Sequence, residues 1–256
     1  MILQSPGDVA FYIMSLPVYW YGIIMAFAVL TGLIAAEKFS KRFGIPPMFW
    51  ADSAPIFIVV GLIGARLYYC LLNFPYYATS VLEIFNIREG GLSIHGMLIF
   101  GIVFLYLFAK MKKIEFFKLA DCLACSVPLA QAIGRFGNFF NSEAFGIPTG
   151  GGWGLFIPLE NRPAEYVDYS LFHPTFLYES ICDLCIFVVL FFLSKKDLKS
   201  GSIFFIYLIL YSVVRIFIEQ IRLDSAMNIF GIPVAQIVSV VIILVSVIGL
   251  YSKKCN

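Results

Sequence analysis

Charged residues are scarce in this sequence. They make up 13% of its 256 residues, whereas hydrophobic residues make up 61%. A soluble domain has about 25% charged and about 45–50% apolar residues. The composition therefore excludes an ordinary soluble protein and indicates a chain that crosses a membrane several times. The formal net charge is only +2, which is too small to favour nucleic acid as a partner.

Cysteine is also infrequent, with six residues. Two pairs, Cys122-x-x-Cys125 and Cys182-x-x-Cys185, would together supply four thiolates for a metal ion. Both pairs lie in apolar helical stretches, where a disulfide framework is not expected and small side chains suit close helix contacts. We therefore predict packing roles for these cysteines, with no metal and no other cofactor. The neighbouring Asp121 and Asp183 are expected to meet polar partners inside the bundle.

Long apolar segments account for most of the chain, and each is long enough to form a membrane-spanning helix. The predicted spans lie near residues 17–37, 54–72, 92–109, 116–139, 174–193, 202–222 and 232–251. The sequence therefore predicts an all-α polytopic membrane protein with seven transmembrane helices. Residues 1–256 are expected to form a single integral membrane domain.

Basic residues gather in alternate connecting segments. Most of the eighteen lysines and arginines follow the first, third, fifth and seventh predicted spans. Cytoplasmic segments are enriched in lysine and arginine, so the pattern predicts that the N-terminus lies outside and the C-terminus lies in the cytoplasm. The long loops 73–91 and 142–172 then face outward, and we expect them to form a small head.

Several polar residues fall at the outward ends of these spans. Arg66 lies in the outer half of the second span, Arg135 near the outer end of the fourth, and Arg215 in the outer part of the sixth. His95 begins the third span and Tyr21 lies early in the first. A charge near the bilayer centre costs about 2.5–3.5 kcal/mol, so such residues are usually paired or functional. We expect polar groups from five helices to converge on one leaflet.

The stretch Gly134–Gly146 is especially polar for the end of an apolar segment. Its sequence is Gly-Arg-Phe-Gly-Asn-Phe-Phe-Asn-Ser-Glu-Ala-Phe-Gly. Arg135 offers a planar fork of donors suited to a phosphate. Asn138, Asn141 and Glu143 supply further donors and an acceptor, and the glycines allow a backbone or ligand to approach closely. These residue types predict a site for an anionic ligand.

Arg215, Glu219 and Arg222 share one helix face because they are four and three residues apart. They form either a structural ion-pair stripe or part of an anion site in which Glu219 supports the arginines. We favour the anion site, because Arg135 arrives at a similar depth from another helix. Tyr211, one turn before Arg215, is expected to face the same cavity.

The chain has two histidines. His95 lies at an outward helix start between glycines, where it is either a general base or a satisfied polar side chain. His173 precedes Pro174, a residue typical of a first helical position, so we interpret it as part of a helix start. Glu179, in the same segment, is a candidate for pairing with a neighbouring helix.

These motifs resemble those of the prolipoprotein diacylglyceryl transferase family over nearly the whole chain. The 134–146 stretch carries the most specific resemblance. The other matching motifs appear in family order: Trp20-Tyr21-Gly22, Gly64-Ala65-Arg66-Leu67-x-Tyr69, His95-Gly96, the 173–179 segment, and the Arg215/Glu219/Arg222 face. The sequence departs from the family pattern at Met97, where many relatives have glycine, and at Phe176, where glutamine is common.

The resemblance implies an enzyme of the bacterial cytoplasmic (inner) membrane with its active site towards the outer leaflet. Members of the family transfer the diacylglyceryl group of phosphatidylglycerol to the lipobox cysteine at the signal peptide of a prolipoprotein. The products are a thioether and glycerol phosphate, and this is the first step of lipoprotein maturation. The resemblance also implies that no metal or nucleotide is needed.

The resemblance and the spacing together give a set of candidate site residues. The resemblance assigns positions that matter for activity to Tyr21, His95, Arg135, Asn138, Glu143 and Arg215. We predict catalytic roles for His95, Arg135, Arg215 and Tyr21. We predict substrate binding by Arg66, Arg135, Asn138, Glu143, Gly146, Tyr211, Glu219 and Arg222. The proton of the acceptor thiol would pass either to His95 or to a water polarised by the arginines.

A transporter or flippase of an organic or lipid anion would also explain arginines within spans. Such transporters typically carry an inverted repeat and a midplane site. This sequence shows no internal repeat, and its polar cluster lies towards one face. A seven-span receptor does not need so many buried arginines. Transfer of lipid to a cysteine-containing peptide would separate the enzyme from both alternatives.

Overall fold

Seven long helices dominate the structure. The computed structural model describes residues 1–86, 90–223, 228–229 and 231–255. Among these residues, seven helices are long and apolar enough to cross a membrane. They are α1 (Trp20–Ser40), α2 (Phe49–Leu72), α4 (Ile94–Lys112), α5 (Phe116–Phe140), α6 (Thr175–Leu193), α7 (Ser202–Glu219) and α8 (Val234–Cys255). The predicted all-α polytopic fold is confirmed, and each predicted span overlaps one of these helices.

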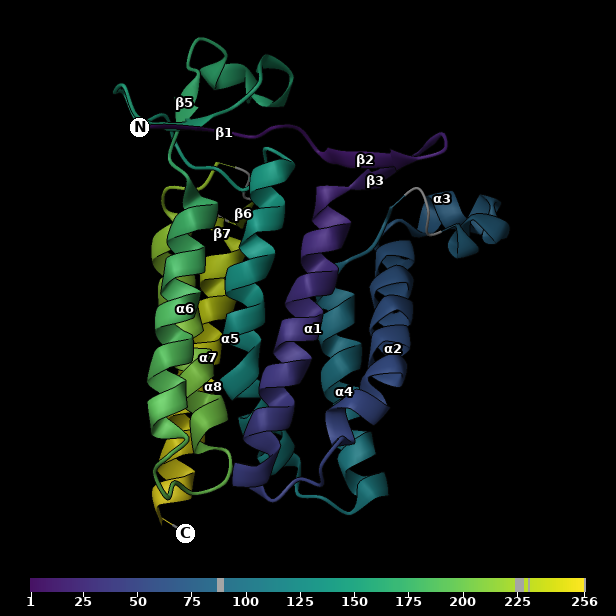
Figure 1. The fold of residues 1–256 in the computed structure, drawn as a ribbon, viewed down its shortest axis with the longest axis vertical. Coiled ribbons are helices and arrows are strands. Elements are labelled where there is room, and N and C mark those ends of the chain that lie inside the picture. The colour runs from purple at the N-terminus through teal and green to yellow at the C-terminus, as the bar shows by residue number, and fades with distance from the viewer. Residues whose placement is uncertain (87–89, 224–227, 230, 256) are drawn as a thin grey trace. The chain divides into compact units, whose positions relative to one another are not determined.

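The chain divides into two compact units. Residues 1–39 and 121–256 form the first unit, and residues 40–120 form the second. The first unit contains α1, most of α5, α6, α7 and α8, while α2 and α4 belong to the second (Figure 1). The assignment of the whole chain to one membrane domain stays a prediction.

In the first unit, α7 packs against both α6 and α8. A buried carboxylate joins α5 to the start of α7. Asp121 Oδ2 accepts the N–H of Gly201 at 2.6 Å, and Oδ1 accepts the N–H of Phe204 at 2.7 Å. The first N–H groups of a helix have no partner within that helix, so this contact caps α7. The expectation that Asp121 meets polar partners is confirmed.

The 142–172 segment folds into a small head with the N-terminus of the chain. Strand β1 (Ile2–Gln4) pairs in parallel with β4 (Gly154–Phe156), which pairs antiparallel with β5 (Leu171–Phe172). Between these two strands lie short 3-10 turns at Leu159–Asn161 and Ala164–Tyr166. The head core contains Phe145, Leu155, Ile157, Phe172 and Phe176. Phe176, a departure from the family pattern, is thus a core residue.

A hairpin precedes α1. Strands β2 (Val9–Ile13) and β3 (Leu16–Tyr19) are antiparallel, and Figure 1 shows them running across the axis of α1. The N–H of Trp20 donates to the carbonyl of Asp8 at 2.9 Å, which joins the hairpin to the helix. The first span therefore begins three residues later than the predicted residue 17, because residues 17–19 are paired in a strand. A second small pair, β6 (Asn228–Ile229) and β7 (Ile232–Pro233), precedes α8.

The second unit is built on a close contact between α2 and α4. A Cβ added to Gly96 would lie 2.2 Å from the carbonyl oxygen of Gly64, and one added to Gly64 would lie 2.4 Å from Phe100 Cβ. Only glycine permits this approach. Met97, the other departure from the family pattern, packs here, since its Cγ would lie 3.3 Å from a Cβ on Gly61.

The loop after α2 in the second unit contains α3 (Phe74–Thr79) and a 3-10 turn at Val81–Phe85. Another 3-10 turn, Lys41–Phe43, follows α1. The predicted head included loop 73–91, and residues 87–89 of that loop lie outside the described part of the chain.

Candidate active site

Three arginines converge on one carboxylate in the first unit. Arg135 Nη2 of α5 forms a salt bridge with Glu179 Oε2 of α6. Arg215 Nη1 of α7 lies 3.5 Å from the same oxygen, and Arg222 Nη1 lies 3.6 Å from Glu179 Oε1. Arg215 Nη2 also pairs with Glu219 Oε2 at 2.6 Å. The predicted convergence of Arg135 with the Arg215/Glu219/Arg222 face is present, and Glu179 is the residue that joins them.

The arginines and the carboxylates differ in exposure. The side chains of Arg135, Arg215 and Arg222 are 18%, 19% and 15% exposed, whereas those of Glu179 and Glu219 are 3% exposed. Three guanidinium groups against two carboxylates leave one net positive charge in this five-residue cluster. The two carboxylates are therefore buried, while part of each arginine side chain stays accessible.

Helix direction explains why these residues meet. Arg135 and Arg215 lie near the C-terminal ends of α5 and α7, and Glu179 lies near the N-terminal end of α6. Because α6 runs opposite to the other two helices, its beginning lies at the level of their ends (Figure 1). Glu179 therefore reaches both arginines within the apolar bundle, where an unpaired charge would be costly.

Gly146 explains how Arg222, just beyond α7, is held at the cluster. Gly146 and Arg222 form an antiparallel β-bridge. The N–H of Ile147 donates to the carbonyl of Ile221 at 2.8 Å, and the N–H of Leu223 donates to that of Phe145 at 3.2 Å. A Cβ on Gly146 would lie 2.7 Å from the carbonyl oxygen of Ile221, so a larger residue would separate the two segments. α7 ends at Glu219 rather than at the predicted residue 222 because the chain turns into this pairing.

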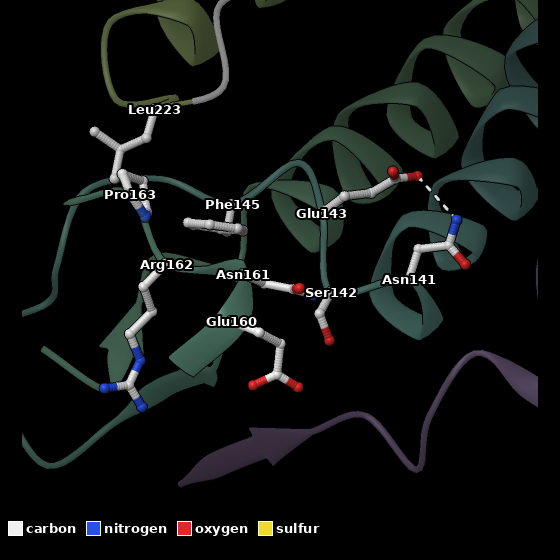
Figure 2. A pocket seen from close by; sticks show the side chains of 9 residues that line it. All are labelled: Asn141, Ser142, Glu143, Phe145, Glu160, Asn161, Arg162, Pro163 and Leu223. Carbon is white, nitrogen blue, oxygen red and sulfur yellow. Dashed lines mark hydrogen bonds between the residues drawn. The ribbon is translucent and has the colours of Figure 1, made fainter. Parts of the chain in front are cut away.

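The polar residues of the 134–146 stretch form a second cluster. Asn138 Nδ2 donates to Glu143 Oε1 at 2.9 Å, and Asn141 Nδ2 donates to the same oxygen at 3.4 Å (Figure 2). The ring of Tyr21, from α1, packs against the helix at Gly137, where an added Cβ would lie 2.9 Å from Tyr21 Cδ2. Two side-chain amides thus bind the same carboxylate oxygen of Glu143 and fix its orientation. Tyr21 packs against α5, the helix that carries Asn138.

A buried polar layer lies one turn further into the bundle. Tyr207 donates its hydroxyl hydrogen to Gln131 Oε1 at 3.0 Å, and its ring lies 6.0 Å from that of Tyr211. Tyr211 lies close enough to Arg135 and Arg215 to interact electrostatically with both, and its role in substrate binding stays a prediction. Gln131 and Tyr207 were not predicted, although each lies four residues before a predicted site residue on the same helix.

Asp183, four residues after Glu179, belongs to this buried layer. Its side chain is 1% exposed, and its Oδ2 has no hydrogen-bond partner among the described residues. The expectation of a polar partner is wrong for this oxygen. Asp183 does interact electrostatically with Arg135. The positive charge of this arginine favours the ionised form of the buried carboxylate.

In the second unit, Arg66 is 6% exposed and binds the loop that follows its own helix. Its guanidinium lies 5.3 Å from the ring centre of Tyr77. Its nitrogens donate to backbone carbonyls of the loop, namely those of Glu83, Ile84, Asn86, Gly90 and Gly91. These contacts make Arg66 a clamp for the loop, and its predicted role in substrate binding stays a prediction.

The two histidines have different surroundings. His95 is exposed in the first turn of α4, with its ring 6.2 Å from that of Tyr68. His173 lies two residues before α6 begins, and its Nδ1 is 3.1 Å from the hydroxyl oxygen of Tyr178. The ring of Trp153 packs edge-on against His173 at 5.2 Å. His173 is thus part of the helix start, as its sequence context predicted.

The Cys-x-x-Cys pairs lie on α5 and α6. Cys122 Sγ donates to the carbonyl of Ala36 at 3.3 Å inside the bundle, whereas Cys185 is exposed. Over the described residues, no group of three or more histidine, cysteine, aspartate or glutamate side chains could hold a metal ion.

The fold and the cluster together define a polytopic membrane protein with partly exposed arginines supported by buried carboxylates. The sequence model of the prolipoprotein diacylglyceryl transferase family matches residues 8–252. The chain belongs to this family, as its motifs predicted.

Curated relatives extend over nearly the whole chain. It is 43% identical to the phosphatidylglycerol–prolipoprotein diacylglyceryl transferase of Synechocystis sp. over 253 residues, covering 96% of this chain and 89% of that protein. The enzyme of the same name from Nostoc sp. is 44% identical, with 97% and 90% covered. That from Parasynechococcus marenigrum is 41% identical, with 99% and 96% covered.

Proposed function

We infer that this chain is a transferase that moves the diacylglyceryl group of phosphatidylglycerol to the cysteine thiol of a prolipoprotein. The reaction is the first step of lipoprotein maturation. Membership of the family over residues 8–252 supports this function. The observation that carries the mechanism is the convergence of three partly exposed arginines on the buried carboxylate of Glu179.

Arg135 and Arg215 hold the phosphate of the donor lipid. A guanidinium makes two directed hydrogen bonds to phosphate oxygens, and such charged bonds are stronger than neutral ones. The existing salt bridges use one terminal nitrogen of Arg135 and both of Arg215. A phosphate that contacts the exposed part of these arginines shares their donors with Glu179 and Glu219. The cluster's net positive charge favours this exchange.

The reaction is a displacement at the glyceryl carbon that bears the phosphate. The cysteine sulfur forms the new C–S bond, the C–O bond to phosphate breaks, and glycerol phosphate leaves with the electron pair. Negative charge grows on the leaving oxygen, and preorganised arginines stabilise that charge in the transition state. Tyr211 and the Gln131–Tyr207 pair support the arginines from within the bundle.

A thiol has a reference pKa of about 8.5, so it is mostly protonated at neutral pH and needs a base. His95 takes the thiol proton in this proposal. It is exposed at the start of α4, and histidine is the side chain that most often acts as a general base. The proton then passes to solvent or to the released phosphate. Arg66 fixes the loop that precedes α4 through its hydrogen bonds to the backbone carbonyls of that loop.

Asn138, Glu143 and Tyr21 orient the substrates. Glu143 accepts hydrogen bonds from two amides, which keeps its second oxygen directed for a substrate hydroxyl or N–H. Gly146 maintains the β-bridge that brings Arg222 to the cluster. Tyr21, Asn138 and Gly146 are uncharged and Glu143 is an acid, so we assign them positioning of the substrates rather than attraction of the anionic donor.

The protein is placed in the bacterial cytoplasmic membrane with its N-terminus outside and its C-terminus inside. Lysines cluster at the end of α4 and after α6, at Lys110, Lys112, Lys195 and Lys196. By the positive-inside rule these ends face the cytoplasm. The arginine cluster lies at the opposite ends of its helices, so it faces the outer leaflet, where phosphatidylglycerol and the exported precursor meet.

The direct test combines purified protein, phosphatidylglycerol and a synthetic lipobox peptide. We expect the peptide to gain the mass of the diacylglyceryl group on its cysteine, with release of glycerol phosphate. A peptide with serine in place of the cysteine is the control and should not react. Movement of lipid between leaflets without any change in peptide mass would instead favour the transporter, which family membership does not support.

A further inference from the structure

A cavity of about 450 Å³ lies in the first unit, between the head and the segment that follows α5. Figure 2 shows its lining. One wall comes from the turn after α5, and the other from the 3-10 turn at Leu159–Asn161 with the two residues that follow it. Its lining side chains are Asn141, Ser142, Glu143, Phe145, Glu160, Asn161, Arg162, Pro163 and Leu223. The size is that of a site for a small ligand or a short peptide segment.

The lining offers many hydrogen-bond acceptors and a small apolar floor. Phe145 is 5% exposed and belongs to the head core, so the floor is firmly packed. Asn141, Asn161 and Ser142 provide polar groups above it, and the side chain of Glu160 is exposed. These surroundings suit backbone N–H groups and small side chains.

The cavity has a negative charge balance. Glu143 and Glu160 contribute two carboxylates against the single guanidinium of Arg162. That guanidinium donates to the carbonyls of Ile157 and Val167, both at 2.9 Å. Its Nε and Nη1 are therefore engaged in holding the head together. A ligand in the cavity meets acceptors and negative charge, which favours N–H donors and positive side chains over acidic ones.

We propose that this cavity binds the polypeptide segment that follows the acceptor cysteine in the prolipoprotein, and that Glu160 selects against acidic residues there. The proposal rests on the proposed function. A precursor whose cysteine reacts at the membrane surface must continue outward past the end of α5, and the cavity lies beyond that end. Glu143 lines the cavity and accepts a hydrogen bond from Asn138, so a peptide bound here lies next to the residues that we assign to substrate orientation.

The glycerol head group of the donor lipid is a less suitable occupant. Its hydroxyls would find acceptors, but the phosphate follows directly after the glycerol and would approach two carboxylates. Like charges close together are destabilising. The arginine cluster already offers the phosphate a favourable position. The charge balance thus assigns the donor to the arginines and the peptide to the cavity.

The test measures kcat/KM for three peptides that are identical up to the cysteine. The residues after it are lysine-rich, glutamine-rich or glutamate-rich. For the wild-type enzyme we expect the lysine peptide to exceed the glutamate peptide by about three- to tenfold, as expected for partly exposed charge pairs. The difference should shrink at high ionic strength because salt screens exposed charges.

Glu160→Lys should reverse this ranking, because it changes the sign of the exposed charge in the cavity. Glu165→Lys is the matched control: Glu165 is exposed on the same head but does not line the cavity. This control should keep the wild-type ranking, and its activity with the glutamine peptide should stay close to wild type.

Three outcomes would overturn the proposal. One is an unchanged ranking in Glu160→Lys, and another is an equal change in Glu165→Lys. The third is a changed KM for phosphatidylglycerol with an unchanged peptide ranking, which would assign the cavity to the lipid head group. In all three the enzyme still transfers lipid, so the proposed function survives. Absence of transfer to any peptide by the wild type would refute the proposed function itself, and the cavity assignment with it.

Discussion

Replacing Glu179 by glutamine removes the charge that three arginines share while keeping the shape of the side chain. Removing one partner of a buried ion pair costs about 3–5 kcal/mol. Here the arginines are 15–19% exposed, so they are not fully buried. We therefore expect a smaller loss of stability, about 2–3 kcal/mol. For a chain of this size that corresponds to roughly 5–10 °C in the thermal unfolding midpoint.

Glu219→Gln provides the comparison. Glu219 pairs with Arg215 within its own helix, whereas Glu179 joins arginines from α5, from α7 and from the segment after α7. We expect its unfolding midpoint to fall less than that of Glu179→Gln. Both variants should be measured in the same detergent with the same lipid content.

Added phosphatidylglycerol gives a more specific readout. A ligand that binds only the folded state stabilises it according to its concentration and affinity. In Glu179→Gln the donor phosphate can replace the missing carboxylate. The lipid should therefore raise the unfolding midpoint of this variant more than that of the wild type, while kcat falls because the arginines lose their fixed orientation. Equal lipid stabilisation of both proteins, or a midpoint for Glu179→Gln within about 1 °C of wild type, would refute this account of the cluster.

Three further predictions concern the base, the orientation and the cysteines. His95→Gln should lower kcat by about 10²–10⁴-fold with little change in lipid binding, and raising the pH should restore part of the rate as the thiol ionises unaided; a normal rate at neutral pH would exclude His95 as the base. A cysteine probe at Ser170, which is exposed on the head, should react with an impermeant reagent in intact cells, and labelling only after permeabilisation would reverse the proposed orientation. Alanine at all four positions of the two Cys-x-x-Cys pairs should leave activity largely intact, whereas loss of activity together with loss of stoichiometric zinc would contradict their packing role.

The helices were predictable because hydrophobic length is a local property of the chain. All seven spans follow from runs of apolar residues. The observed helix ends differ from the predicted ones where the chain pairs its backbone with a segment far away in the sequence. α7 ends before Arg222 because the following residues pair with the segment around Gly146. Strand β1 was not predicted, since a three-residue strand depends on its partner, residues Gly154–Phe156, far away in the sequence.

The site was predictable to the extent that helix spacing determines it. The common face of Arg215, Glu219 and Arg222 follows from their positions on one helix, and the level of Arg135 follows from span direction. The central place of Glu179 depends on three helices packing together, so spacing suggested only that it would pair with a neighbour. The carbonyls that bind Arg66 belong to an irregular loop, whose path no periodic pattern describes.

We propose that Arg135 and Arg215 hold one phosphate together, and a double-mutant cycle distinguishes this arrangement from two independent roles. Arg135→Lys, Arg215→Lys and the double variant keep the charge but lose the bidentate geometry. Each single variant should lose about ten- to a hundredfold in kcat/KM for phosphatidylglycerol, since a charged hydrogen bond contributes about 1.5–3 kcal/mol. If both side chains act on one phosphate, the double variant should lose far less than the product of the single losses. Near-wild-type activity in either lysine variant, or strictly multiplicative losses, would contradict the claim.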